Sequence, residues 1–452
     1  MRVVIVGGGA AGMSAASRVK RLRRDWEVVV LERTRWVSFA LCGIPYYTSC
    51  MVKRLEDLVH YPASFFREKR GIDVRLGHEV VDVEDGRVRV RSGGDEYTLD
   101  YDFLVLATGA KPVVPRSLSE ALELDGVYAI AHLDDAERLR RRLEAGARKP
   151  VVIGGGLLGL ELAEALHSWG LKVTIVEKME RLLPAMLDPE LGDKLTSIVS
   201  KVEGVEVVTG RGAASIEGSG RVERVVLEGG ETLDADLVVL SVGRRPDTSL
   251  AERLGLRIGE SGAVWTDERM ATSKEGVYAV GDVAEVKSVV LERNIWCPFA
   301  QVANKMGYVA GSNIAGVETR LRGVACTSAT RVFGVTVAKT GLSLEEAKRL
   351  GFDAGAADVE AGTKAKYIPG GSWIHLRVVY DRSTGRLLGA QALSGDESGF
   401  WRVNVVAALL MKKAEIWDLF EADIGYTPLL SPVWDPLVIA ARLALREVGG
   451  RR

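Results

Sequence analysis

"RVVIVGGGAAGMSAASRVKRL", residues 2–22, is the stretch that decides the fold. A run of β-branched residues leads into three glycines, and an alanine-rich segment with helical spacing follows. A second segment of this kind, PVVIGGGLLGLELAEALHSWG, occupies residues 150–170. Each continues into another apolar run, at 27–33 and at 172–178. Two strand–helix–strand units predict an α/β protein with parallel sheets.

The glycines of both units have the spacing G-x-G-x-x-G, and an acidic residue ends each following strand, Glu32 and Glu177. Such a turn brings backbone N–H groups and a helix N-terminus to a pyrophosphate, while the acid accepts hydrogen bonds from a ribose. The alternative, a plain glycine-rich turn, is less consistent with two such contexts in one chain. Two dinucleotide sites predict a flavoprotein that is reduced by a nicotinamide cofactor. The six glycines are Gly7, Gly9, Gly12, Gly154, Gly156 and Gly159.

Length and composition exclude several classes of protein. At 452 residues the chain exceeds one core, and about three domains are expected. A net charge of -1 predicts no nucleic-acid partner, and the apolar runs are too short for a membrane span. With a strand expected from residue 2, we expect no targeting peptide and a cytoplasmic protein. Few Asn and Gln among many charges are typical of a thermophilic source.

The four cysteines, Cys42, Cys50, Cys297 and Cys326, have no C-x-x-C spacing and predict no disulfide framework. The five histidines have no metal-ligand spacing, so no metal site is expected. Cys297 and Cys326 are expected to be structural. Cys42 precedes Gly-Ile-Pro at the start of a predicted helix, whose N-terminus favours a thiolate.

The remaining chain predicts a change of architecture near residue 324. Further strands are expected at 103–112, 235–247 and 276–282, and the TGAKP and VGRRPD segments within them are interpreted as crossings between domains. Beyond 324 the pattern predicts antiparallel hairpins. Helices are expected around 401–413 and 415–422.

In order, the motifs GGGAAG, SFALCG, ATGA, GGGLLG, VGRRPD and AVGD resemble the pyridine-nucleotide disulfide oxidoreductases from end to end. SFALCGIPYY, ANKMG, YIPGG and YTPLLSPVWDP are similar to its single-cysteine branch, which holds coenzyme A-disulfide reductases, NADH oxidases, NADH peroxidases and NAD(P)H sulfur reductases. The resemblance implies a glutathione-reductase-like fold. It places an FAD domain at 1–112 and 244–322, an NAD(P) domain at 113–243 and an α+β dimerisation domain at 323–452.

The resemblance makes Cys42 the redox-active sulfur. The C-x4-C dithiol of other members is absent, because Tyr47 stands at the second position. A lone thiolate forms a mixed disulfide that electrons from the reduced flavin must open. Cys50 as a resolving thiol remains an alternative. The expected activity is NAD(P)H-dependent reduction of a small disulfide, with coenzyme A disulfide first and polysulfide or sulfur next.

The resemblance also assigns cofactor contacts. Glu161 resembles the acid that orients the nicotinamide, and Glu177 predicts NADH, with NADPH possible because of Lys178. The FAD contacts are Gly7, Gly9, Ala11, Gly12, Glu32, Arg33, Ser38, Thr108, Gly109, Gly281, Asp282 and Ala300. The NAD(P) contacts are Gly154, Gly156, Leu157, Leu158, Gly159, Glu161, Glu177, Lys178 and Gly243.

Substrate residues follow from the same resemblance. Tyr367 and Tyr426 match tyrosines that reach the partner subunit's cysteine, which implies a homodimer with shared active sites. A phenol of this kind can protonate a departing thiolate. The expected coenzyme A contacts are Ser14, Arg18, Arg21, Ser38, Arg70 and Asn304.

Several positions depart from the branch and keep other acceptors open. Leu41, Ile368 and Leu157 replace residues common among members of the family, and Trp434 replaces a lysine that contacts coenzyme A. These departures leave room for polysulfide or for an NADH oxidase that reduces O2. The first glycine turn lacks the histidine of the peroxidases. Two hypotheses place the protein in another functional class. One is an electron-transfer reductase for a rubredoxin or ferredoxin, and the other is a redox-dependent interaction protein.

Overall fold

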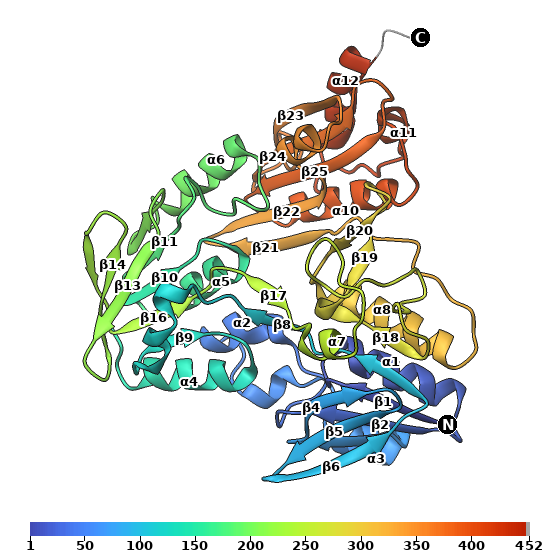
Figure 1. Cartoon of the computed structure of the whole chain (residues 1–452). Helices are drawn as coiled ribbons and strands as arrows, with labels where there is room; N and C mark the ends of the chain where they lie inside the picture. The colour runs from blue at the N-terminus through green and yellow to red at the C-terminus, as the bar shows by residue number, and fades with distance from the viewer. Residues whose placement is uncertain (449–452) are drawn as a thin grey trace. The chain divides into compact units, whose positions relative to one another are not determined.

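The computed structural model describes residues 1–448, which form two compact units (Figure 1). Unit 1 comprises residues 1–113, 131–138 and 243–324. Unit 2 comprises residues 114–130 and 139–242 together with the chain from 325 onward. Each unit contains a five-stranded parallel sheet, so the predicted α/β class is confirmed. The division into an FAD, an NAD(P) and a dimerisation domain stays a prediction.

Unit 1 is built on the sheet β18-β7-β1-β2-β3, in which all neighbouring strands are parallel. Because β1 lies in the middle, its carboxyl end meets those of β2, β7 and β18 at one edge, where ligands of such sheets bind. A second, antiparallel sheet, β4-β5-β6, was not predicted. The strands are β1 Arg2–Val6, β2 Glu27–Glu32, β3 Asp73–Leu76, β4 Glu79–Glu84, β5 Arg87–Ser92, β6 Asp95–Asp100, β7 Phe103–Leu106 and β18 Val277–Ala279.

The two longest helices of unit 1, α1 and α8, pack closely on each other. Glycines on α8 make this possible, because a Cβ on Gly307 would lie 2.2 Å from the carbonyl oxygen of Ala11 and one on Gly311 2.7 Å from that of Ala15. The helices are α1 Ala10–Leu22, α2 Ile44–Thr48, α3 Ala63–Arg70, α7 Ser249–Arg253 and α8 Ala300–Ile314.

Short strands complete unit 1. The segments predicted to be domain crossings pair with each other as β8 (Ala110–Pro112) and β17 (Arg244–Pro246), in antiparallel register. A further hairpin joins β19 (Glu285–Lys287) to β20 (Asn294–Trp296). One of the boundaries between the units, after Arg138, falls within α4 (Leu133–Glu144).

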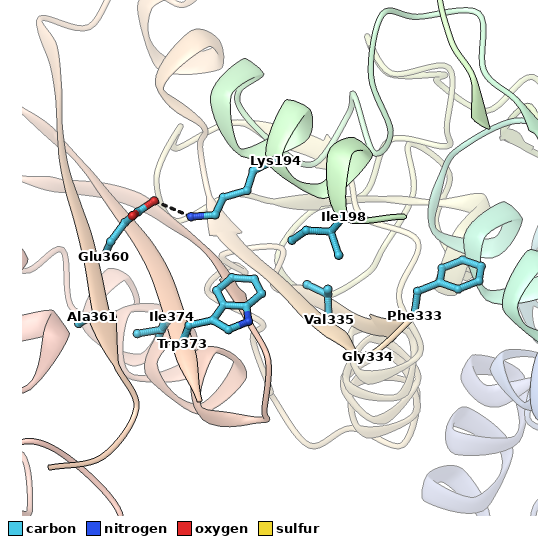
Figure 2. Close-up of a pocket in the computed structure, with 9 residues that line it drawn as sticks. All are labelled: Lys194, Ile198, Phe333, Gly334, Val335, Glu360, Ala361, Trp373 and Ile374. Atoms are coloured by element: carbon cyan, nitrogen blue, oxygen red, sulfur yellow. Dashed lines mark hydrogen bonds and ion pairs between the residues drawn. The ribbon is translucent and has the colours of Figure 1, made fainter. Parts of the chain in front are cut away.

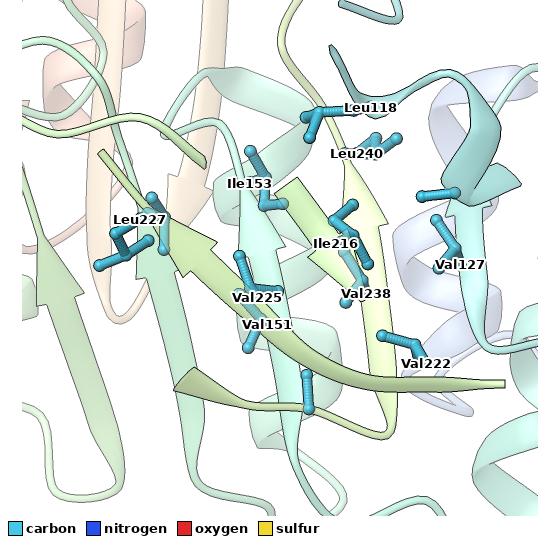
Figure 3. Packing of buried hydrophobic residues seen from close by; sticks show 13 residues of the cluster. Leu118, Val127, Val151, Ile153, Ile216, Val222, Val225, Leu227, Val238 and Leu240 are labelled. Atoms are coloured by element: carbon cyan, nitrogen blue, oxygen red, sulfur yellow. The ribbon is translucent and has the colours of Figure 1, made fainter. Parts of the chain in front are cut away.

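Unit 2 repeats the parallel plan with the sheet β12-β11-β10-β16-β9, and adds the antiparallel sheet β13-β14-β15. Figure 3 shows side chains of β10 and β16, such as Val151 and Val238, beside those of β13 and β14, such as Ile216 and Val225. These four are at least 93% buried and belong to one core cluster. The elements are β9 Val127–Ala129, β10 Pro150–Ile153, α5 Leu157–His167, β11 Val173–Val176, α6 Pro189–Val199, β12 Val205–Val208, β13 Ala213–Gly218, β14 Val222–Leu227, β15 Thr232–Asp234 and β16 Leu237–Leu240.

The chain beyond 324 forms the antiparallel sheet β21-β22-β25-β24-β23, as the sequence predicts. Helix α10 packs on β22 and β25, and α12 packs on β23 and β24. Helix α12 was missed by the sequence analysis. The elements are β21 Ser328–Val332, β22 Val335–Gly341, α9 Leu344–Arg349, β23 Ala354–Gly362, β24 Trp373–Asp381, β25 Leu387–Ser394, α10 Ser398–Leu410, α11 Ile416–Glu421 and α12 Pro436–Val448.

The cysteines differ in their bonding. Cys42 and Cys50 are free and exposed, whereas Cys297 and Cys326 are disulfide-bonded. Disulfide bonding was not predicted, because no cysteine pair in the sequence has a characteristic spacing. Within residues 1–448, no helix has the length and apolar character needed to cross a membrane.

The contact between α1 and α8 gives a stability prediction. Gly307→Ala places a methyl group against the Ala11 carbonyl and should lower the free energy of unfolding by about 1–3 kcal/mol. Lys305→Ala, on an exposed position of α8, is the matched control and should change little. Thermal unfolding of the holoenzyme measures both. Equal melting temperatures for the two variants would contradict the close approach.

Candidate functional site

The first glycine turn lies at the carboxyl end of β1, between strand and helix. Gly7 has φ +107°, and a Cβ there would lie 2.2 Å from the Ala107 carbonyl oxygen. A Cβ on Gly12 would lie 2.0 Å from the Gly7 carbonyl, so both positions require glycine. A Cβ on Gly9, at the N-terminus of α1, would meet nothing within 4 Å. The turn therefore leaves open space where the backbone N–H groups of α1 begin.

Glu32, at the end of β2, holds this turn in shape. Its carboxylate accepts hydrogen bonds from the backbone N–H groups of Gly8 and Thr34, both at 2.8 Å. The side chain is 6% exposed. A carboxylate has about four lone-pair sites, so two remain for ribose hydroxyls.

The ends of β7 and β18 complete the same edge of the sheet. The hydroxyl group of Thr108 donates to the Asp247 carbonyl at 2.7 Å, and the Gly109 carbonyl accepts from the Asp247 N–H at 2.9 Å. Gly281, with φ +76°, packs against Ala11, so that Asp282 follows beside the start of α1. Burial raises the pKa of the Asp282 carboxyl, and the charge of Arg244 partly opposes this shift.

Two residues beside the predicted FAD contacts were missed by the sequence analysis. The guanidinium group of Arg33 lies 3.1 Å from Nε2 of His132, which is 99 residues away in the chain. Burial, together with the charge of Arg33, lowers the pKa of His132. Because a guanidinium group can only donate, Nε2 is the acceptor in this contact. Arg244 donates to the Ala110 carbonyl at 2.6 Å. No local pattern marks His132, whereas Arg244 lies within the VGRRPD motif and was not assigned a role.

The segment that carries Cys42 is tied to the first glycine turn. The N–H of Ser38 donates to the Gly8 carbonyl at 2.8 Å, and the Ser38 carbonyl accepts from His60 N–H at 2.9 Å. Cys42 lies in a single 3-10 turn, Leu41–Gly43, that continues into α2. Its side chain is exposed. The thiol is thus accessible on a segment whose start contacts the turn.

The residues predicted to contact coenzyme A all lie in unit 1. Ser14 of α1 donates to the Asn304 carbonyl of α8 at 2.8 Å. Arg18 donates to the hydroxyl group of Ser312 at 2.8 Å and stacks over the Tyr308 ring at 4.2 Å. Neither contact neutralises the Arg18 charge, which stays available for a phosphate.

Two more arginines belong to this set. Arg21 is exposed near the end of α1, and Arg70 stacks over Phe65 at the end of α3. Two predicted cofactor contacts also lie in unit 1. Ala300 is the first residue of α8, and Gly243 is the first residue of the last segment of the unit.

Unit 2 repeats the glycine turn in detail. Cβ atoms on Gly154 and Gly159 would lie 2.2 and 1.9 Å from carbonyl oxygens, whereas one on Gly156 would meet nothing within 4 Å. Glu177 accepts from the N–H groups of Gly155 at 2.7 Å and Met179 at 2.8 Å. Leu157 and Leu158 begin α5. The second predicted nucleotide site therefore has the same construction as the first.

Glu161, the predicted nicotinamide-orienting acid, accepts a hydrogen bond from the hydroxyl group of Thr330 at 2.6 Å. Burial raises the pKa of Glu161, the Thr330 hydrogen bond opposes the shift, and the charge of Glu164 adds to it. The basic residues that follow Glu177 are both paired. Lys178 binds Glu228 at 2.9 Å, and Arg181 binds Asp193 at 3.0 Å.

Tyr367 and Tyr426 come together in unit 2, although 59 residues separate them. Their hydroxyl oxygens are 3.5 Å apart, and the side chains are 71% and 47% exposed. The hydrogen bond with Tyr367 raises the pKa of Tyr426. The structure thus places both phenols at one exposed point of the chain.

None of the residues that line a cavity of about 610 Å³ in unit 2 is a predicted site residue (Figure 2). Two of its lining residues, Lys194 and Glu360, point toward each other and form an ion pair at 2.5 Å. His375 also contacts Glu360, at 3.2 Å. The lining residues are Lys194, Ile198, Phe333, Gly334, Val335, Glu360, Ala361, Trp373 and Ile374.

Both glycine turns fit a dinucleotide, because each leaves open space at a helix N-terminus and places a buried carboxylate beside it. Two such turns in one chain are typical of an oxidoreductase that binds two dinucleotides. Residues 1–307 match the model of the family "Pyridine nucleotide-disulphide oxidoreductase", and residues 327–437 match its dimerisation domain. The chain belongs to this family, and it is an oxidoreductase that uses FAD and NAD(P)H.

Several similar proteins are named as sulfur reductases or as oxidases. The chain is 46% identical to the NAD(P)H sulfur oxidoreductase (CoA-dependent) of Pyrococcus abyssi, over 98% of this chain and 97% of that one. It is 32% identical to an NADH oxidase of Methanocaldococcus jannaschii, over all of both chains. The solved structure of an NAD-dependent persulfide reductase from A. fulgidus superposes with a TM-score of 0.95 at 36% identity, covering 100% of this chain and 84% of that one.

The paired basic residues beside Glu177 give a prediction for coenzyme choice. Because Lys178 is held by Glu228, NADH should be used at least as well as NADPH. Glu228→Gln releases Lys178 for a 2′-phosphate and should raise kcat/KM for NADPH by roughly two- to fivefold, with NADH unchanged.

Glu231→Gln, which breaks the exposed ion pair with Arg211, is the matched control. Steady-state kinetics with both coenzymes measures the effect. In the unaltered enzyme, a kcat/KM for NADPH more than about tenfold above that for NADH would contradict the role of Glu177.

Proposed function

We propose that the chain is an FAD-dependent NAD(P)H oxidoreductase that reduces a small disulfide through Cys42. Coenzyme A disulfide is the first candidate substrate, and polysulfide or sulfur is the second. The carrying observation is the exposed Cys42 thiol on a segment that Ser38 ties to the first glycine turn. The names of the Pyrococcus abyssi and A. fulgidus relatives support this substrate class.

When bound, FAD accepts a hydride from NAD(P)H and supplies the electron pair that reduces a sulfur bond. The residues of the chain perform the remaining steps. The Cys42 thiolate attacks one sulfur of the substrate disulfide, forms a mixed disulfide and displaces the first thiolate, which takes up a proton. The electron pair then cleaves the mixed disulfide, which regenerates the Cys42 thiolate and releases the second thiolate. In total, two electrons and two protons convert one disulfide into two thiols.

Tyr367 and Tyr426 are the proposed donors of protons to the departing thiolates. A homodimer in which each subunit lends its tyrosines to the partner's Cys42 completes the site. The match to a dimerisation domain supports the dimer. The exposed apolar side chains around Tyr426 also support it, because a second subunit would cover them.

Coenzyme A fits the basic residues of unit 1. Arg18 keeps its charge while its orientation is fixed by Ser312 and Tyr308, and Ser14 and Asn304 meet beside it. Phosphate groups favour such guanidinium groups. Arg21 and Arg70 are the further proposed phosphate contacts.

Reduction of O2 is the second candidate function. The Methanocaldococcus jannaschii relative is named an NADH oxidase, and Leu41 beside Cys42 departs from the coenzyme A reductases. Transfer of electrons to a rubredoxin- or ferredoxin-type protein has less support, because that reaction needs no exposed cysteine.

The role of Cys42 gives the first kinetic prediction. Cys42→Ser should lower kcat for coenzyme A disulfide at least about a thousandfold, because no sulfur remains to form the mixed disulfide. Reduction of bound FAD by NADH should persist. Cys50→Ser, which alters the other free and exposed cysteine, is the matched control and should retain activity. Disulfide turnover by Cys42→Ser near the unaltered rate would contradict the proposal.

The shared site gives the second kinetic prediction. Homodimers of Cys42→Ser and of Tyr367→Phe/Tyr426→Phe should both be impaired. A mixed dimer has one site with an intact Cys42 and both tyrosines, so coexpression should restore up to half of the activity per dimer. Coexpression of Cys42→Ser with a tagged copy of itself is the control. A mixed dimer no more active than its parents would exclude sites shared between subunits.

A further inference from the structure

The segment that carries Tyr426, residues 422–435, has few apolar anchors of its own. Leu430 is 74% exposed and Val433 70% exposed. From 422 to 434, Ser431 is the buried residue. The other large exposed side chains of the segment are Tyr426, Leu429 and Trp434. Its conformation within one subunit therefore depends on polar contacts.

A buried ion pair closes this segment. Arg402 of α10 and Asp435 are 7% and 5% exposed. The Nε of Arg402 donates to Asp435 Oδ2 at 3.0 Å, and one terminal nitrogen donates to the same oxygen at 2.7 Å. The hydroxyl group of Ser431 donates to this carboxylate at 2.9 Å and lies 3.3 Å from the guanidinium group. One carboxylate thus binds both α10 and the segment.

A chain of hydrogen bonds also connects Arg402 to the segment that carries Tyr367, residues 364–371. Arg402 donates to the Ser398 carbonyl at 3.3 Å. The N–H of Ser398 donates to Asp396 at 3.1 Å, and Thr363 also binds Asp396. Thr363 in turn exchanges two hydrogen bonds with Ser372, each 2.9 Å long, which close the base of the Tyr367 segment.

The two tyrosine segments also contact each other directly. The N–H of Ala365 donates to the Pro428 carbonyl at 3.2 Å. The same two segments bring the hydroxyl oxygens of Tyr367 and Tyr426 to 3.5 Å from each other. Arg402 contacts Asp435 and Ser431 directly, and it is linked to the base of the Tyr367 segment through Ser398 and Asp396.

We propose that Arg402 is a positioning residue that sets the Tyr367–Tyr426 pair through Asp435 and Ser431. This inference rests on the proposed function, in which the phenols protonate departing thiolates. The planar guanidinium group holds a carboxylate with several donors in fixed geometry, which a lysine cannot reproduce. Removing one partner of a buried pair leaves an uncompensated charge, so the segment would change its conformation.

The experiment uses the full-length holoenzyme. Arg402→Lys keeps the charge and loses the planar fork, and Ser431→Ala removes the hydroxyl group alone. Arg382→Lys is the matched control, because Arg382 binds Glu447 at 2.8 Å elsewhere in unit 2. Arg402→Lys should lower kcat for coenzyme A disulfide at least about tenfold, since small misplacement of a reacting group has large effects. Rapid reduction of FAD by NADH should be unchanged.

A double-mutant cycle separates positioning from general destabilisation. Tyr426→Phe should lower kcat in the unaltered enzyme and have little further effect in Arg402→Lys, whereas in Arg382→Lys its effect should persist in full. Additive effects in the Arg402→Lys background would overturn the inference.

Amide hydrogen exchange tests, independently of activity, whether the contacts of Arg402 with Asp435 and Ser431 hold the two segments in place. Exchange at Ala365, Leu430 and Ser431 should rise in Arg402→Lys and not in Arg382→Lys. Unchanged exchange at these amides would overturn the proposal that Arg402 holds the segments. If Tyr426→Phe alone is without effect, the proposed proton donation fails, and unchanged kcat in Arg402→Lys despite raised exchange would reject positioning.

Discussion

The site of unit 1 depends on two hydrogen bonds made by the backbone N–H and carbonyl groups of Gly8. The N–H binds the Glu32 carboxylate, and the carbonyl accepts from the N–H of Ser38, both at 2.8 Å. One bond fixes the turn against the end of β2, and the other fixes the start of the segment that leads to Cys42. A Cβ on Gly8 would lie 3.0 Å from Val37 and 3.3 Å from Glu32, so a larger residue would disturb both bonds. Gly8 therefore contacts both the end of β2 and the segment that leads to Cys42.

Much of this arrangement could be predicted from local sequence. The parallel sheets, both glycine turns and their acids follow from short-range patterns, because a strand, a tight turn and a helix have direct signatures. His132 could not be predicted, since it reaches the site only through tertiary contacts, whereas Arg244 lies in the VGRRPD motif and was not assigned a role. Helix α12 was missed, and the bonding of Cys297 and Cys326 has no local signal. The roles assigned to Cys42, Tyr367 and the arginines came from family resemblance and stay predictions.

The same scaffold serves different electron acceptors among its relatives. The names of similar proteins include sulfur, polysulfide and coenzyme A disulfide reductases as well as NADH oxidases. The nucleotide turns have little room to vary at four positions, because Cβ atoms on Gly7, Gly12, Gly154 and Gly159 would lie 1.9–2.2 Å from backbone oxygens. Choice of acceptor must then lie in what surrounds the exposed sulfur. In this chain Leu41 beside Cys42 departs from the pattern of the family, whereas the paired exposed phenols Tyr367 and Tyr426 match it.

Mass spectrometry of the Cys42 peptide from enzyme isolated without reductant tests the central claim most directly. The account predicts one coenzyme A joined to Cys42 by a disulfide, released by dithiothreitol, because the mixed disulfide is the resting oxidised form. A sulfenic acid at Cys42 would instead indicate oxidase or peroxidase chemistry. An unmodified Cys42 in enzyme that still reduces coenzyme A disulfide would contradict the account.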